Sequence, residues 1–175
     1  MPDLLNGIPR VDPEKRPTGW RNVLLRLFAT KPGSVIHRVL AAPIDAPLMR
    51  LTRGHLNSGA GAIPLVILRT TGAKSGVQRD VPLGYFTDGD DVILIASNYG
   101  QVNHPGWYYN LLKHPECELL ADGRSGRFVA RPAEVADRDR LFALAEAYYS
   151  GYARYAANTN GIRTIRVMRL APATD

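Results

Sequence analysis

One short segment of the chain collects residue types that bind phosphate. Residues 70–79 read TTGAKSGVQR, so hydroxyls, a lysine, an arginine and two glycines share one tight connection. Glycine lets backbone N–H groups face a ligand, and the cations and hydroxyls supply the other donors that a phosphate needs. The spacing differs from that of a P-loop. Composition alone leaves two interpretations open: an anion site, or a surface hairpin whose basic residues are incidental.

A second segment brings aromatic side chains to a junction between a loop and a helix. Residues 96–115 read ASNYGQVNHPGWYYNLLKHP. Trp107, Tyr108 and Tyr109 could stack on a flat ligand while the free N–H groups at the helix start meet its polar edge. The plainer alternative is that Trp107 packs the helix onto its own domain. His104 and His114 lack the spacing of metal ligands, so we expect no metal.

A third segment, YYSGYARY, places a tyrosine at every third position: Tyr149, Tyr152 and Tyr155. Core packing is the common explanation for such a stripe. Three phenols also make a wall that is apolar in body with proton donors at the tips, which suits a flat substrate bearing a carbonyl or nitro group. The chain has neither a G-x-S-x-G elbow nor paired carboxylates in an apolar setting. The reactive group is therefore expected to come from a bound cofactor.

The elements that must position these segments follow from hydrophobic spacing. Helices are predicted at residues 20–29, 34–53 (interrupted at Pro43 and Pro47), 107–114 and 137–149, the last capped by Asp137. Strands are predicted at residues 63–70, 81–87, 92–97, 116–121, 126–135 and 162–170. The first three strands are joined by short turns, so they must be antiparallel neighbours, and a Rossmann fold is excluded. The predicted class is α+β, a small antiparallel barrel or roll of about six strands with flanking helices.

Length, charge and cysteine content narrow the class of protein. The 175 residues suit one domain, and no apolar run is long enough to span a bilayer. Cys117 is the single cysteine, and the N-terminus lacks the layout of a signal peptide, which favours the cytoplasm. Residues 1–60 hold nine basic and four acidic side chains, so they carry +5 of the net charge of +6. This favours an anionic partner, but the chain lacks the interleaved aromatic platform of a nucleic-acid binder.

We predict an N-terminal extension over residues 1–33 and a single domain over residues 34–175. Within the extension, residues 20–29 (WRNVLLRLFA) are amphipathic, with Arg21 and Arg26 as the basic members. Such a helix could lie on an anionic membrane surface, which would place the protein near lipophilic substrates. The alternative is a terminal helix that packs on its own domain.

Residues 34–172 resemble the deazaflavin-dependent nitroreductase and F420H2-dependent quinone reductase family, whose members bind coenzyme F420 on a split β-barrel. The resemblance is carried by LRTTGAKSGVQRDVPLGY, ASNYGQVNHPGWYYNL and YYSGYARYAANT. It implies an oxidoreductase that transfers hydride from reduced F420 to a quinone, enone or nitro-aromatic acceptor. It also implies that the fold is a split barrel and that a homodimer is common.

The resemblance further implies a role for individual residues. It assigns the phosphate and acidic tail of the cofactor to Lys74, Ser75 and Arg79, with Thr70 and Thr71 beside them. It assigns the deazaflavin ring to Ala96, Ser97 and Asn98, and support of ring and tail to Pro105, Gly106, Trp107 and Asn110. Tyr149, Tyr152 and Tyr155 would line the acceptor site, where one of them or Ser97 would hydrogen-bond the developing anion. Two positions depart from the family pattern, which often has tyrosine at the position of Gly84 and glycine at the position of Tyr99.

Two other functions stay open on the sequence. The same barrel could use FMN in place of F420. It could also be a non-catalytic protein that binds a deazaflavin, a lipid or a tetrapyrrole.

Overall fold

Six antiparallel strands close into a barrel in the computed structural model, which describes residues 3–15, 18–30, 42–52 and 63–174. The strands are β3 (Leu65–Thr71), β4 (Gln78–Asp88), β5 (Asp91–Ile95), β6 (Glu116–Ala121), β7 (Arg124–Pro132) and β8 (Val167–Pro172). They follow the order β3-β4-β5-β8-β7-β6, and β6 closes the ring by pairing with β3. The predicted α+β barrel is confirmed.

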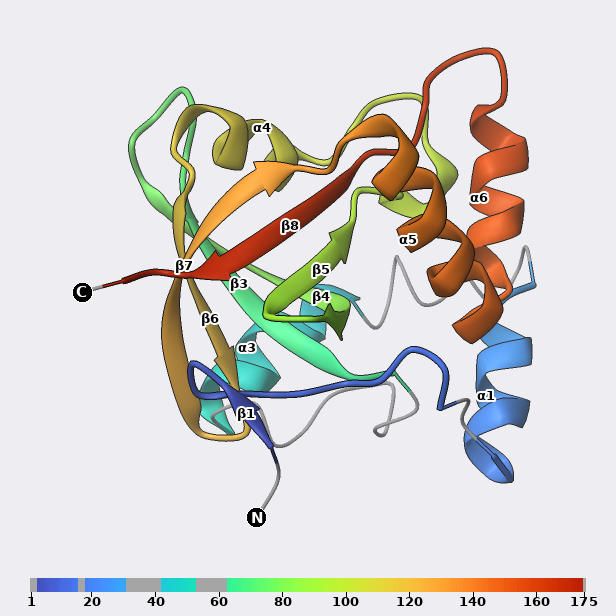
Figure 1. Ribbon diagram of the computed structural model, residues 1–175, viewed down its shortest axis with the longest axis horizontal. Helices are drawn as coiled ribbons and strands as arrows, with labels where there is room; N and C mark the ends of the chain where they lie inside the picture. The colour runs from blue at the N-terminus through green and yellow to red at the C-terminus, as the bar shows by residue number, and fades with distance from the viewer. Residues whose placement is uncertain (1–2, 16–17, 31–41, 53–62, 175) are drawn as a thin grey trace.

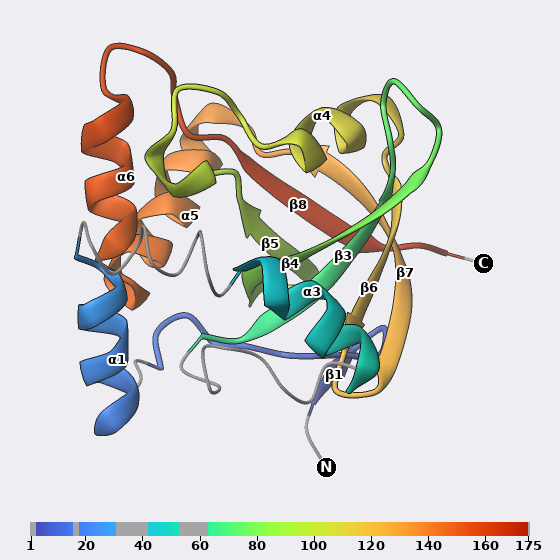
Figure 2. The same ribbon diagram turned by 180° about the vertical axis from the view of Figure 1, so that it is seen from behind.

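Helices flank the barrel (Figures 1 and 2). They are α1 (Trp20–Phe28), α3 (Ala42–Leu51), α4 (Gly106–Lys113), α5 (Val135–Tyr148) and α6 (Gly151–Thr159). In both views α5, α6 and α1 gather on one side of the barrel, and α4 lies beside the connection between β3 and β4. Pro47 lies inside α3. The beginning of the predicted helical stretch 34–53 and the loop at residues 55–62 lie outside the described residues.

The buried side chains form two clusters on either side of the barrel wall. Val92 and Leu94 of β5 join the cluster inside the barrel, whereas Ile93 and Ile95 join the cluster beneath α5 and α6. Side chains alternate between the faces of a strand, so a strand that is covered on both faces reads as a continuous apolar run. This burial explains the sequence VILI and fixes α5 and α6 against β5.

The N-terminal residues complete the inner cluster. A two-stranded ribbon of β1 (Leu4–Leu5) and β2 (Ile8–Pro9) buries Leu5 and Ile8 among the barrel side chains. Val11 and Thr87 exchange backbone and side-chain hydrogen bonds, which continues the attachment beyond the ribbon. Residues 3–11 thus contribute to the barrel core, while the division at residue 33 stays a prediction.

The predictions for α6, for the last strand and for the cap of α5 are wrong. Helix α6 was not predicted as an element of its own, because the break at residues 149–150 hides the helical spacing that follows. The last strand occupies Val167–Pro172 rather than residues 162–170, because residues 160–166 return from α6 to the barrel. Asp137 does not cap α5: the helix begins at Val135 after Glu134, and Asp137 lies in its first turn.

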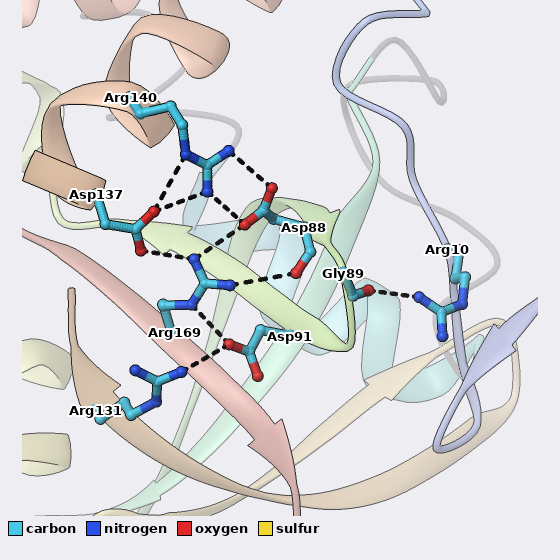
Figure 3. Close-up of polar contacts among 8 residues, drawn as sticks. All are labelled: Arg10, Asp88, Gly89, Asp91, Arg131, Asp137, Arg140 and Arg169. Carbon is cyan, nitrogen blue, oxygen red and sulfur yellow. Dashed lines mark hydrogen bonds and ion pairs between the residues drawn. The ribbon is translucent and has the colours of Figure 1, made fainter. Parts of the chain in front are cut away.

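Asp137 belongs instead to a network of ion pairs (Figure 3). Arg169 of β8 donates to Asp91 at 2.6 Å, to Asp137 at 2.7 Å and to Asp88 at 3.0 Å. Arg140 of α5 donates through both terminal nitrogens to Asp88. The hydrogen bonds from Arg140 and Arg169 lower the pKa of Asp88, and the contribution of Arg140 is the larger. The network ties the turn between β4 and β5 to α5 and β8.

Candidate active site

The connection between β3 and β4 is a tight turn, residues 72–77, which we call the anion turn. Thr71 pairs with Gln78 across the two strands. Gly72 leaves little room for a side chain at the start, because a Cβ there would lie 3.0 Å from the carbonyl oxygen of Val77 and 2.6 Å from the Oγ of Ser75. Lys74, Ser75 and Arg79 are exposed, and neither cation forms an ion pair with a described residue. Unpaired cations and a hydroxyl around a glycine cradle fit an anionic ligand.

Helix α4 holds the anion turn from behind. The Nδ2 of Asn110 donates to the Oγ1 of Thr70 at 3.1 Å, and its Oδ1 accepts from the N–H of Ala73 at 2.9 Å. Thr70 and Asn110 are 2% and 8% exposed, and their hydrogen bonds position the turn. The Nζ of Lys113 donates to the carbonyl of Ala73 at 2.6 Å. Lys113 was not predicted, although it follows Asn110 by three residues and shares its helix face.

Residues 96–104 form a strained loop after β5, which we call the ring loop. Ala96 is buried, and Ser97 and Asn98 are half-buried. Asn98 and Tyr99 have φ angles of 48° and 53°, within a short 3-10 turn (Asn98–Gly100). Positive φ is uncommon for residues other than glycine and costs on the order of 1–3 kcal/mol for a strained residue. The surrounding contacts must therefore hold this conformation.

The start of α4 follows the ring loop. Pro105 is the N-cap, and Gly106 is an exposed first residue whose N–H has no partner within the helix. Trp107 is only 7% exposed and packs in the inner cluster with Leu111. Most of the Trp107 side chain therefore packs α4 onto the barrel, as the plainer interpretation predicts.

The three predicted tyrosines do gather, at the junction of α5 and α6. Ring centroids of Tyr149, Tyr152 and Tyr155 lie 5.6–6.4 Å apart in edge-to-face contacts. The hydroxyls of Tyr149 and Tyr155 are 3.5 Å apart. Burial raises the pKa of Tyr149 and of Tyr152 above the ordinary value of a phenol. Both phenols are therefore protonated near neutral pH and act as hydrogen-bond donors.

The space next to these tyrosines is small. A cavity of about 30 Å³ is lined by Gly84, Tyr152 and neighbouring apolar residues. A Cβ on Gly84 would lie 3.9 Å from the hydroxyl oxygen of Tyr152, so Tyr152 occupies the space above this glycine. Tyr85 lines the same cavity, but its hydroxyl donates to the carbonyl of Pro9. Tyr99 joins the tyrosines through an edge-to-face contact with Tyr155 at 6.1 Å.

Arg154 is a cation at the tyrosine cluster that was not predicted. Its guanidinium carbon lies 5.3 Å from the ring centroid of Tyr155. Both terminal nitrogens are buried and have no hydrogen-bond partner among the described residues. Its sequence context, one residue before Tyr155, carried no signal that distinguishes it from a surface arginine.

The three segments form one continuous side of the molecule. The anion turn adjoins α4, the ring loop leads into α4, and the ring loop also touches α6 (Figure 1). The last contact is close, because a Cβ on Gly100 would lie 3.0 Å from the Cα of Tyr155. In the described part of the chain, no three His, Cys, Asp or Glu side chains gather as metal ligands would.

The fold is thus a closed antiparallel barrel with exposed cations at one turn and a cluster of aromatic side chains beside the barrel, which is the class of barrel that can hold a flat, anionic cofactor. The model of the F420H(2)-dependent quinone reductase family matches residues 45–170. The chain is 35% identical to an F420H(2)-dependent quinone reductase of Mycobacterium tuberculosis over an alignment of 136 positions, which covers 71% of this chain and 91% of that protein. The chain therefore belongs to the F420H(2)-dependent quinone reductase family.

Solved structures agree with this assignment. An F420-H2 dependent reductase is 33% identical with a TM-score of 0.55, and the match covers 61% of this chain and 93% of the other. A structure described as a domain-swapped dimer is 27% identical with a TM-score of 0.56, and covers 80% and 99%. Family membership confirms the predicted oxidoreductase, its cofactor F420 and transfer of hydride to a quinone. FMN and a non-catalytic role are not favoured.

Proposed function

We propose that the anion turn, the ring loop and the tyrosine cluster together form the site of this reaction. The observation that carries the proposal is their continuity: Asn110 joins the anion turn to α4, and Gly100 joins the ring loop to α6. The cofactor has an anionic tail and a flat ring, and the side of the molecule offers cations at one end and aromatic side chains at the other.

The anion turn would bind the phosphodiester and glutamate tail of F420. Lys74 and Arg79 supply charge, Ser75 supplies a hydroxyl, and Thr71 lies at the edge of the turn. Thr70 and Asn110 keep the turn in shape through their mutual hydrogen bond. In this proposal the exposed cations supply the affinity, and the buried neutral side chains hold the shape of the turn. Cations are not expected in the buried positions, because burying an unpaired charge costs free energy.

The ring loop and the start of α4 would position the ring. Ala96, Ser97 and Asn98 offer backbone and hydroxyl groups, Gly106 offers a free N–H, and Pro105 and Trp107 fix the direction of α4. Reduced F420 supplies a hydride when bound. The residues around it have only to align the acceptor, exclude water and donate a hydrogen bond where negative charge develops.

The tyrosine cluster would receive the acceptor. The hydroxyl of Tyr149, Tyr152 or Tyr155, or the hydroxyl of Ser97, donates to the acceptor oxygen. The cavity of about 30 Å³ holds about one water molecule, so acceptor binding has to displace tyrosine rings. Any flat apolar molecule with a polar oxygen meets these demands, and we propose enones and nitro-aromatics beside the quinone.

The site is tested by removing the two cations of the anion turn. Lys74→Ala with Arg79→Ala should raise the dissociation constant of F420 at least about tenfold, and added salt should shrink the difference. The matched control is Lys15→Ala with Arg124→Ala, which removes two exposed cations elsewhere. Fluorescence titration of F420 measures both variants. Equal dissociation constants for the two would refute the assignment of the tail to this turn.

We further propose that α1 contacts an anionic membrane from the cytoplasm, close to lipophilic quinones. Trp20, Val23 and Leu27 are 58–60% exposed, and the guanidinium of Arg21 lies 5.7 Å from the Trp20 ring centroid. Exposed apolar side chains beside a cation are what an interfacial helix needs. Leu25 packs in the cluster beneath α5 and α6, so the helix also remains attached to the barrel. No described helix has the length and apolar character of a membrane span.

Membrane contact is measured by sedimentation with vesicles that contain anionic lipid. Val23→Glu with Leu27→Glu should move the protein from the pellet to the supernatant. Val135→Glu with Ile162→Glu, two exposed apolar residues on other elements, is the control. Substitution is preferable to deleting the first 33 residues, because Leu5 and Ile8 belong to the barrel core.

A homodimer is the remaining proposal about partners. It is supported by the relative described as a domain-swapped dimer. Light scattering coupled to size-exclusion chromatography distinguishes one 19.2 kDa chain from two.

A further inference from the structure

Arg163 lies in the return from α6 to β8 and has no part in the site as described so far. Its side chain forms hydrogen bonds with several residues of the ring loop. The Nη2 donates to the carbonyl of Ser97 at 2.6 Å, the Nε to the carbonyl of Gln101 at 2.9 Å, and the Nη1 to the carbonyl of Ala96 at 3.2 Å. The Nη1 also lies 3.1 Å from the Nδ1 of His104. One guanidinium thus touches the beginning, middle and end of the loop.

The ring loop needs such a support. Asn98 and Tyr99 both have positive φ, and the loop contributes few hydrogen bonds of its own: Gly100 to Ser97, Gln101 to Asn98, and the Nδ2 of Asn98 to Asn103. A guanidinium presents several N–H groups in one rigid plane, whereas a lysine ammonium offers a single point of contact. The four contacts therefore require arginine, and lysine cannot reproduce them.

The contact with His104 depends on protonation. Arg163 can only donate, so the Nδ1 of His104 must accept and the ring must be neutral with its proton on Nε2. The groups that face His104 are Arg163, Arg166 and the rings of Tyr108 and Tyr109, at 5.0 and 6.1 Å. Burial, and then the two arginines, lower the pKa of His104. A proton on Nδ1 would face a guanidinium, and the contact would be lost.

We propose that Arg163 is the positioning residue of the ring loop and that neutral His104 completes its contacts, so that acid loosens the loop. The inference rests on the proposed function, because it matters to F420 only if the ring loop holds the cofactor. It adds a residue outside the three segments and a pH dependence of their geometry.

The first experiment measures hydrogen–deuterium exchange of residues 96–104 in the cofactor-free protein. Arg163→Gln and Arg163→Lys should both speed exchange in the loop at least about tenfold, while β3 to β8 stay protected. Arg124→Gln, at an exposed arginine of β7, should leave the loop as it is. Unchanged loop exchange in Arg163→Gln would overturn the inference.

The second experiment separates this inference from the proposed function. Arg163→Gln should also raise the dissociation constant of F420 at least about tenfold. If it does not, while Lys74→Ala with Arg79→Ala does, the site stands and the positioning role of Arg163 is wrong. If neither variant weakens binding, the assigned site itself is wrong, and faster loop exchange in Arg163→Gln would then report only a structural contact.

The histidine is tested by pH. Between pH 7.5 and 5.5, loop exchange corrected for its intrinsic pH dependence should rise in the natural protein. It should stay constant in His104→Asn, whose Oδ1 can accept from Arg163 but cannot take up a proton at these pH values. An NMR titration of His104 should give a pKa below 6.5, the ordinary value. Equal responses of the two proteins to acid would remove His104 from the proposal.

Discussion

Phenols that burial keeps protonated define the chemistry available at the scale of single residues. Tyr149 and Tyr152, at the junction of α5 and α6, can donate hydrogen bonds near neutral pH but cannot act as bases, because burial raises the pKa of both. The same principle makes Cys117 inert, since burial raises its pKa to about 12. Reactivity therefore comes from the cofactor, and the chain supplies orientation and donors.

Replacing one phenol separates turnover from cofactor binding. Tyr152→Phe removes a hydroxyl from the small cavity and leaves the ring contacts with Tyr149 and Phe142 in place. We expect kcat with a quinone to fall about tenfold or more, and the dissociation constant of F420 to change less than about twofold. Steady-state kinetics and fluorescence titration measure the two. Tyr109→Phe, at an exposed tyrosine, is the control, and a Tyr152→Phe enzyme with full turnover would contradict the role of this hydroxyl.

At the scale of elements, one side chain connects helix α4 to the anion turn. Asn110→Ala removes two hydrogen bonds and leaves the Oγ1 of Thr70 and the N–H of Ala73 without those partners. We expect a loss of about 2 kcal/mol in the free energy of unfolding and weaker F420 binding. Thr70→Val with Asn110→Leu should recover stability better than affinity, since neither side chain then orients the turn. Denaturant titration measures the stability of each variant, and F420 titration measures its affinity for the cofactor.

The ion-pair network joins β8 to α5 and to the turn between β4 and β5 (Figure 3). Arg169→Met leaves three carboxylates without their shared partner. We expect the free energy of unfolding to fall by about 2–3 kcal/mol. Arg131 also binds Asp91, but its side chain is 59% exposed, so Arg131→Met should cost at most about 1 kcal/mol. Urea unfolding compares the two variants, and similar losses would show that burial does not set the strength of these pairs.

At the scale of the whole molecule, stability should fall in two steps as the solution becomes acid. Burial and the nearby arginines hold the pKa of His104 below 6.5, so its contribution is complete above about pH 6.5 and is lost below it. Hydrogen bonds from Arg140 and Arg169 hold the pKa of Asp88 below 3.8, so that contribution is lost only below about pH 4.

Melting temperatures of single variants separate the two steps. His104→Asn should flatten the decline between pH 6.5 and 5, and Asp88→Asn should flatten the decline below pH 4. Each variant should keep the other step. A natural protein whose melting temperature is the same at pH 6.5 and at pH 5 would contradict the first step.

The sequence by itself determined the class of barrel, most strands and helices, and the three segments that we propose as the site. Apolar runs, turn residues and helical spacing are local, so they are visible within about ten residues of chain. It also identified the exposed cations at Lys74 and Arg79 and the stripe of tyrosines. Family membership confirmed the cofactor that the same segments had indicated.

Only the tertiary structure decided which groups touch across the chain. Asn110 reaches Ala73 over 37 positions and Arg163 reaches Ser97 over 66, and no local pattern marks either pair. The structure also moved the last strand to Val167–Pro172, separated α6 from α5 and buried Trp107 in the core. The physical reason is that packing and hydrogen bonds between distant segments outweigh local propensity wherever the local sequence allows more than one conformation.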